Sequence, residues 1–402
     1  MPERANLWYW LGETTIHFPR GRDDYEQGLA HFRRAAELDP NNANVLLHLH
    51  VAYSLAGDLT ALAENAELRA ELDGDEVTRL YARWLSAGLA GDSAAAAEVG
   101  EEYEAGPTAF PLFPFDTPAA LVASWQIGPI VQSLELLQNN TIPGSASAMQ
   151  RTFAVYYGYQ DLGMQERADG VLSAFERATG ARYDRMRLLD AIYGALPESA
   201  GLAAAGRLQA IHDTLAVERW TNTSAGERIA LEMWRIMHDD LSRVPATTQE
   251  LREYGTGLAP ARAMGTEVQA LLLEAMVQVR TGDPAARRTI EAFDELFLQG
   301  PPGLGVDVYD AMVLAAADTY ERVGDPDMAL QALERESNFN NLRAPYGARF
   351  ARERGRLAAL TGDTVRAIRE YQYFTLMRSQ AELSLRREVE EVRAELEILR
   401  GG

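Results

Sequence analysis

The dipeptide Gly-Asp recurs along this chain between stretches whose apolar residues follow a helical spacing. Glycine can end a helix in the left-handed conformation that other residues avoid, and an aspartate after it can cap the next helix. A connection this short folds the two helices antiparallel. The sequence therefore predicts a series of helix pairs, with turns at Gly57-Asp58, Gly91-Asp92, Gly282-Asp283, Gly324-Asp325 and Gly362-Asp363.

The helix pairs resemble tetratricopeptide repeats, whose period of 34 residues separates Asp58 from Asp92. The first unit has Trp8, Leu11 and Gly12 in the family's Trp-x2-Leu-Gly pattern. Other units carry matching residues at the packing positions, namely Leu46, Leu49, Tyr53, Val313, Ala317, Tyr320, Gly355, Ala358 and Tyr371. The resemblance implies an all-α fold, a right-handed α-solenoid of antiparallel helix pairs with a degenerate middle and a C-terminal capping helix.

The match to the repeat pattern is strong near both ends of the chain and weak between them. We expect regular repeats over 1–106, an irregular connection rich in proline and aromatic residues over 107–145, degenerate helical repeats over 146–300, and repeats plus the capping helix over 301–402. The prolines between Phe110 and Phe115 forbid a helix there. That segment either fills the space between helical layers or forms an exposed apolar patch.

The chain is also similar to the C-terminal helical-repeat regions of bacterial multidomain serine/threonine kinases and transcriptional activators. This resemblance rests on Trp8 to Glu13, on Leu46 to Asp58 and on the ending Ala367 to Leu396. It implies a role in a bacterial signalling or multiprotein assembly. No kinase motif and no helix-turn-helix pattern occurs in the sequence.

Composition excludes several kinds of chemistry. The net charge of -21 disfavours nucleic acid and anionic membranes as partners. The chain has no cysteine and no lysine, and its histidines lack metal-ligand spacing, so we expect no metal, no cofactor and no catalytic residue. His48 and His50 are two apart on a predicted helix and are expected to be packed side chains. The absence of a signal pattern and of a long apolar run favours a cytoplasmic protein without membrane insertion.

The resemblance to tetratricopeptide repeats points to a groove that the first helix of each pair lines. Carried onto this chain, the groove positions are Asn44, Leu47 and Val51 near the start and Arg349, Arg352 and Arg356 near the end. The three arginines are either ordinary solvated helix surface or a site for a carboxylate or an acidic peptide. The leading hypothesis is a protein-interaction scaffold or adaptor that binds a protein or peptide and is not an enzyme.

Two alternatives stay open at this stage. A sensory or regulatory module would bind a small molecule or peptide inside the solenoid, in a pocket lined by aromatics such as Trp125, Tyr156 and Trp234. A carboxylate-based hydrolase or transferase would need three or more acids around an ion in the middle segment. Separately, the last helix has an apolar stripe that would allow a homo-oligomer. It consists of Val389, Val392, Leu396 and Leu399.

Overall fold

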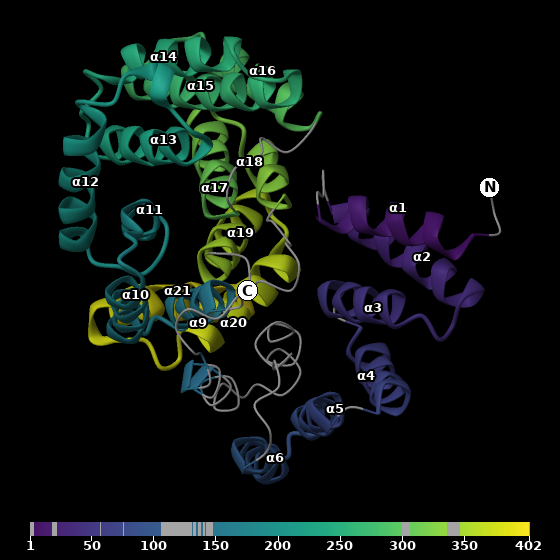
Figure 1. Cartoon of the computed structure of the whole chain (residues 1–402). Helices are drawn as coiled ribbons and strands as arrows, with labels where there is room; N and C mark the ends of the chain where they lie inside the picture. Colours follow the sequence, from purple (N-terminus) through teal and green to yellow (C-terminus); the bar gives the residue numbers. More distant parts are fainter. Residues whose placement is uncertain are drawn as a thin grey trace.

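The structure, a computed structural model, describes residues 4–17, 22–56, 58–74, 76–105, 131, 134–135, 138–139, 141, 148–299, 306–335 and 346–401. All secondary structure in these ranges is helical, as predicted for an all-α chain. The helices fall into two groups, an N-terminal arm and a larger C-terminal ring (Figure 1).

The arm consists of three consecutive helix pairs that curve along one side of the ring (Figure 1). Each helix packs against the next along the chain. The arm helices are α1 (Ala5–His17), α2 (Arg22–Leu38), α3 (Ala43–Ala56), α4 (Leu59–Asp73), α5 (Glu76–Leu89) and α6 (Ser93–Ala105).

The ring continues the same arrangement of helix pairs, and its last helices return to its first ones (Figure 1). Its helices are α9 (Ala148–Asp161), α10 (Gln165–Thr179), α11 (Asp184–Ile192), α12 (Glu198–His212), α13 (Asn222–Met237), α14 (Val244–Thr256), α15 (Pro260–Thr281), α16 (Ala286–Phe297), α17 (Val306–Arg322), α18 (Pro326–Leu333), α19 (Gly347–Thr361), α20 (Thr364–Met377) and α21 (Arg386–Gly401). Short 3-10 turns lie at Val217–Arg219 and Leu383–Leu385.

The Gly-Asp turns do what the sequence predicts. Gly324 and Gly362 have φ values of 83° and 87°, and each ends the first helix of a pair. The aspartates that follow cap the second helix, because Asp325 accepts from the backbone N–H of Met328 at 3.2 Å. Asp363 accepts in the same way from Arg366 at 3.1 Å. These local interactions reverse the chain without a long loop, which keeps the paired helices antiparallel.

Close packing within a pair depends on a glycine that faces an aromatic ring. A Cβ atom placed on Gly355 of α19 would lie 2.4 Å from Cδ1 of Tyr371 on α20. Gly12 of α1 faces Phe32 of α2 in the same way. The Trp-x2-Leu-Gly pattern therefore has a direct packing reason, because the absence of a side chain at Gly12 and Gly355 lets the second helix approach.

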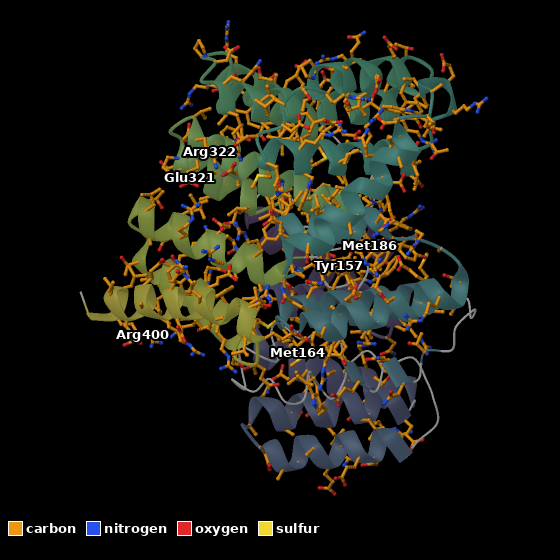
Figure 2. The ribbon with its side chains drawn as sticks, turned by 90° about the vertical axis from the view of Figure 1, so that its left-hand side faces the viewer. Tyr157, Met164, Met186, Glu321, Arg322 and Arg400 are labelled. Carbon is orange, nitrogen blue, oxygen red and sulfur yellow. The ribbon has the colours of Figure 1, made fainter. Side chains whose placement is uncertain are left out.

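Buried apolar residues form separate clusters in the arm and in the ring. One large cluster runs through the ring from Leu188 to Leu357. Another joins the start and end of the ring, because it contains Tyr157 and Met186 together with Phe374, Val389 and other C-terminal residues. Tyr157 and Met186 lie in the middle of the body, whereas Glu321 and Arg322 lie at its edge (Figure 2). The second cluster holds the ring closed.

Backbone and side-chain hydrogen bonds reinforce this closure on the outside of the ring. The N–H of Glu382 donates to the carbonyl of Gly163 at 3.1 Å. The carboxylate of Glu382 accepts from the N–H of Glu166 at 2.8 Å, and Ser384 donates to Gln165 at 2.6 Å. The connection between α20 and α21 is thereby fixed to the first turn of α10. We call this junction the seam.

The last helix, α21, covers the end of the array, as predicted for a capping helix. Val389, Val392 and Leu396 are buried in the cluster that closes the ring, and Leu399 packs beside them. The apolar stripe that the sequence suggested as a homo-oligomer contact is thus packed within the chain.

The packing of Gly355 against Tyr371 gives a stability prediction. Gly355→Ala should lower the free energy of unfolding by about 1–3 kcal/mol, because the new methyl group must displace a buried ring. Gly170→Ala is a matched control in α10, since nothing lies within 4 Å of the added Cβ. It should raise stability by about 0.5–1 kcal/mol through the helix preference of alanine. Chemical denaturation measures both, and equal effects would contradict the packing argument.

Candidate functional site

The inner helices of the ring meet through buried polar contacts. Arg185 of α11 donates two hydrogen bonds to the carboxylate of Asp307 on α17, at 2.9 and 3.1 Å. Tyr156 of α9 donates its hydroxyl proton to the buried carboxyl group of Asp190 on α11. The N–H of Ala348 on α19 donates to Asp161 of α9 at 3.1 Å. The first helices of four pairs, which are α9, α11, α17 and α19, therefore contact one another. They meet where the groove of a solenoid would otherwise run.

Among the carboxyl groups of these inner helices, Asp190 has a strongly shifted pKa. Burial raises its pKa to about 8, and the charge of Asp307 on α17 acts in the same direction. The hydrogen bond from Tyr156 on α9 and the charge of Arg187 on α11 lower the pKa and only partly offset burial. The group therefore retains its proton near neutral pH in the folded chain.

This perturbed carboxyl group predicts a pH dependence of stability. The folded chain holds the proton of Asp190 more tightly than the unfolded chain, whose carboxyl pKa is about 4. Its contribution to stability is therefore present below pH 4 and declines as pH rises toward 8. Asp190→Asn keeps a donor for this site and removes the titration, so its unfolding midpoint should fall less than that of the wild type between pH 5 and pH 8.

The control for this comparison is Asp327→Asn, which removes an exposed carboxylate. Its profile should run parallel to that of the wild type. Parallel profiles for Asp190→Asn and the wild type would show that Asp190 does not titrate in this range.

The arginines predicted for the C-terminal groove lie together on α19 but are paired within the chain. Arg349 lies 3.0 Å from Glu353, Arg352 lies 3.2 Å from Glu388 on α21, and Arg356 lies 2.5 Å from Glu321 on α17, measured from guanidinium nitrogen to carboxylate oxygen. Burial alone would raise the pKa of Glu353, but the three arginines hold it below its usual value. A partner carboxylate would have to replace one of these pairs.

The aromatic residues named for an enclosed pocket are not brought together. Tyr156 belongs to the cluster that closes the ring, whereas Trp234 belongs to the large cluster and stacks on His238 at 4.0 Å. Trp125 lies outside the described residues. A cavity between Tyr193 and Arg349 has a volume of about 70 Å³, which is far below the ~300 Å³ of small ligand pockets.

The residues predicted for the N-terminal groove lie along α3 and differ in exposure. Asn44 is exposed, Leu47 is half-buried and Val51 is buried. Asn44 and Leu47 are thus the two whose side chains reach the surface. They lie in the arm, on another part of the molecule from the arginines of α19, so the structure does not join the two predicted sets into one groove.

The sequence analysis missed a group of three polar side chains next to these residues, which are Tyr9, Glu13 and His48. The Nε2 atom of His48 of α3 contacts the carboxylate of Glu13 of α1, and its other ring nitrogen lies 2.7 Å from the carbonyl oxygen of Asn44. The ring of Tyr9 meets that of His48 edge-on at 5.1 Å. Burial and the charge of Glu13 raise the pKa of Tyr9 to about 12. His48 and His50 are packed side chains, as predicted, since His50 is fully buried.

An exposed apolar face on α1 was also missed. Leu7, Trp10 and Leu11 lie at i, i+3 and i+4 on this helix and are 42%, 62% and 47% exposed. The repeat register could have revealed it. With Trp8 aligned to Leu46, Leu7 and Leu11 correspond to Val45 and Leu49 of α3, which are buried in a cluster with residues of α2. The corresponding residues of α17, which are Met312, Ala315 and Ala316, are buried as well.

Three other points of the sequence analysis concern the Phe110 to Phe115 segment, a metal site and a membrane span. The segment Phe110 to Phe115 lies outside the described residues. In the part of the chain that the structure describes, no three His, Asp or Glu side chains are grouped as a metal site would require. Within the same ranges, no helix is both long and apolar enough to span a bilayer.

Comparisons with known proteins place the fold only loosely. No protein-family model and no curated protein matches the sequence. Structural matches include yeast Tom70, with 11% identity over 98% of this chain and 95% of the other and a TM-score of 0.34. The TPR domain of P58(IPK) matches at 13% identity, with 98% of both chains covered and a TM-score of 0.24. Naa15/Naa10 bound to HypK-THB matches at 15% identity, over 99% of this chain and 70% of the other, with a TM-score of 0.23. At such scores, the description of the fold depends on the helix pairs themselves.

Proposed function

We propose that this chain is a protein-interaction scaffold and that the face formed by Leu7, Trp10 and Leu11, here called the α1 face, is its docking surface. The observation that carries the proposal is the exposure of these side chains. The counterparts of Leu7 and Leu11 are buried in both α3 and α17, and the counterpart of Trp10 is buried in α17 and half-buried in α3. Contiguous exposed apolar side chains on a folded protein mark interaction sites. The repeat geometry makes the α1 face a ready site for one more helix.

The arm itself indicates what kind of partner fits. The equivalent face of α3 is covered by α2, whose Leu29, Phe32 and Ala35 are buried in one cluster with Val45 and Leu49. A partner that supplies an amphipathic helix with a similar apolar stripe would extend the array by one layer. Helix-in-groove recognition of this kind reads apolar anchors at i, i+3 and i+7 spacing.

The predicted groove residues differ in how well they could contact a partner. Asn44 and Leu47 reach the surface of the arm and would extend the docking surface along α3. Val51 would contribute less because it is buried. Arg349, Arg352 and Arg356 would serve an acidic partner only by exchanging Glu321, Glu353 or Glu388 for its carboxylates.

The wider setting is part of the same proposal. The residues that resemble bacterial helical-repeat regions, including Trp8 to Glu13, favour a cytoplasmic adaptor in a bacterial signalling or multiprotein assembly. In that setting the chain would bind its partners without catalysis. Trp10 and Leu11 of the α1 face lie within Trp8 to Glu13, which links the docking surface to the proposed setting.

A synthetic peptide with the sequence of residues 22–40 tests the proposal, because α2 is the natural cover of an equivalent face. We expect the labelled peptide to bind the full chain in fluorescence anisotropy. Trp10→Ser should weaken binding by about tenfold or more, since burial of a large apolar side chain contributes ~1.5–3 kcal/mol. Leu47→Glu should weaken it by a smaller factor.

Two controls make the result specific. Leu202→Ser changes a leucine of α12 that is also largely exposed, and it should leave peptide binding unchanged. A peptide with serine in place of Leu29 and Phe32 should not bind. Equal affinities of the wild type and Trp10→Ser for the unmodified peptide would show that α1 is not the docking surface.

A further inference from the structure

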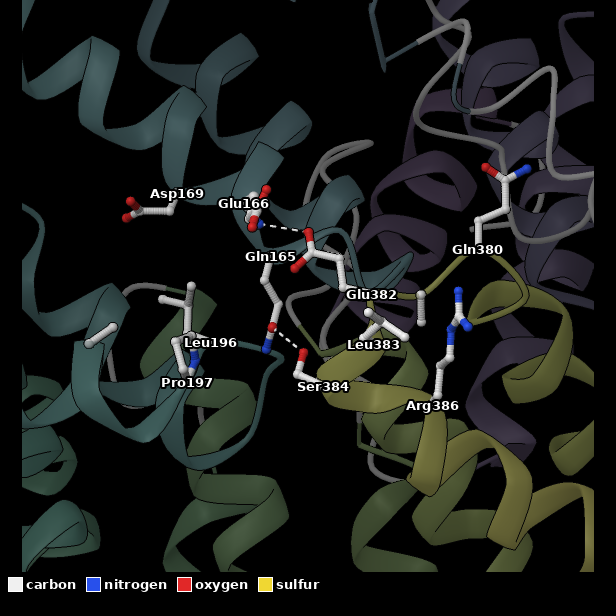
Figure 3. A pocket seen from close by; sticks show the side chains of 12 residues that line it. Gln165, Glu166, Asp169, Leu196, Pro197, Gln380, Glu382, Leu383, Ser384 and Arg386 are labelled. Carbon is white, nitrogen blue, oxygen red and sulfur yellow. Dashed lines mark hydrogen bonds between the residues drawn. The ribbon is translucent and has the colours of Figure 1, made fainter.

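A pocket of about 790 Å³ lies at the seam, where the ring closes. One wall comes from the first turn of α10 and the start of α12, and the other comes from the connection between α20 and α21 (Figure 3). Its volume falls within the ~300–1,000 Å³ that is usual for ligand sites. None of the groove residues predicted from the sequence lines it.

Part of the pocket is apolar. Leu196 and Pro197 line it from the ring side, and Ala381 and Leu383 line it from the C-terminal side. Leu383 is 76% exposed, although it lies in an otherwise ordered 3-10 turn. A ligand group that covers Leu383 would remove apolar surface from water, which favours binding.

The charged lining is mostly acidic. Glu166, Asp169 and Glu382 contribute carboxylates, against the single guanidinium of Arg386. Figure 3 shows Glu166 and Asp169 on α10, Glu382 reaching Glu166 from the opposite wall, and Arg386 beyond Leu383. Asp169 shares its carboxylate with Arg187 at 3.2 Å, whereas Glu166 has no ion-pair partner among the described residues. Together with the net charge of -21, this lining favours a cation.

One hydrogen bond holds the side-chain amide of Gln165 at the pocket. Gln165 is only 8% exposed, and its side-chain oxygen accepts from Ser384. Its amide nitrogen has no acceptor in the part of the chain that the structure describes, and the residue lines the pocket. This donor is not sealed from solvent, so it is available to an acceptor from a ligand.

We propose that the seam pocket binds an extended peptide segment in which an arginine or lysine side chain lies next to an apolar one. The carboxylates of Glu166 and Asp169 receive the cation, and Leu383 packs against the apolar side chain. The amide of Gln165 donates to a backbone carbonyl of the peptide. This site is separate from the α1 face and does not depend on it.

Ligand binding here also stabilises the ring. The two walls belong to segments about 200 residues apart in sequence that meet only through ring closure. A ligand that contacts both walls binds the closed ring and not the opened one. It therefore raises the unfolding temperature as its concentration increases above the dissociation constant.

The experiment uses two synthetic probes with the full chain, acetyl-Gly-Leu-Arg-Leu-Gly-amide and the same peptide with glutamate in place of arginine. Isothermal titration calorimetry should detect binding of the arginine peptide only, and that peptide should raise the unfolding temperature. Glu166→Gln and Leu383→Ser should each weaken binding by about tenfold, the loss expected for one charge-assisted contact or one covered leucine.

The matched controls are Glu390→Gln and Val365→Ser, which change exposed residues outside the pocket. Both should bind the arginine peptide as the wild type does. Trp10→Ser should also retain binding, which separates this site from the α1 face. Glu166 and Leu383 are exposed, so their variants should unfold at the wild-type temperature without peptide. Absence of binding to the wild type, equal binding of both peptides, or full affinity in the two pocket variants would overturn the proposal.

Discussion

The contact of α11 with α17 in the middle of the ring determines which surfaces the rest of the chain can offer. It is made by the ion pair of Arg185 and Asp307, whose carboxylate is almost fully buried. A buried pair of this kind adds little net stability, but loss of one partner would leave an uncompensated charge. The inner helices therefore meet in one arrangement. Because they contact each other there, the chain's own helices fill that part of the concave side, and the docking surfaces that we propose lie in the arm and at the seam.

The chain has no lysine, so arginine is the side chain with a permanent positive charge that links neighbouring helix pairs. Its planar guanidinium can form two parallel hydrogen bonds to one carboxylate, as Arg335 does with Asp294 at 2.5 and 2.8 Å. Arg356 makes a bidentate contact of the same kind with Glu321 on α17 of the preceding pair. Such contacts fix both distance and orientation between successive pairs. The arginine row of α19 thus has a structural role in addition to any role in binding.

The two ends of the array differ in how their apolar surface is covered. At the C-terminal end, α21 places Val389, Val392 and Leu396 over the last pair. At the other end, the described residues place no helix over Trp10 and its neighbours on α1. Solenoids need a covered or polar face at each end to stay soluble. An additional helix over the uncovered face of α1 would therefore remove apolar area from water.

The sequence by itself determined the helix pairs, because their signals are local. Gly324 with Asp325 fixes a turn, and Gly355 with Tyr371 fixes the approach of two helices that are neighbours in the chain. It also placed Arg349, Arg352 and Arg356 on one helix, but it could not show that Glu388 and Glu321 would pair with them. Only the tertiary structure decided the ring closure, the burial of Asp190 and the seam pocket. Each of these depends on how small rotations between successive pairs add up over many repeats, and no short sequence pattern encodes that sum.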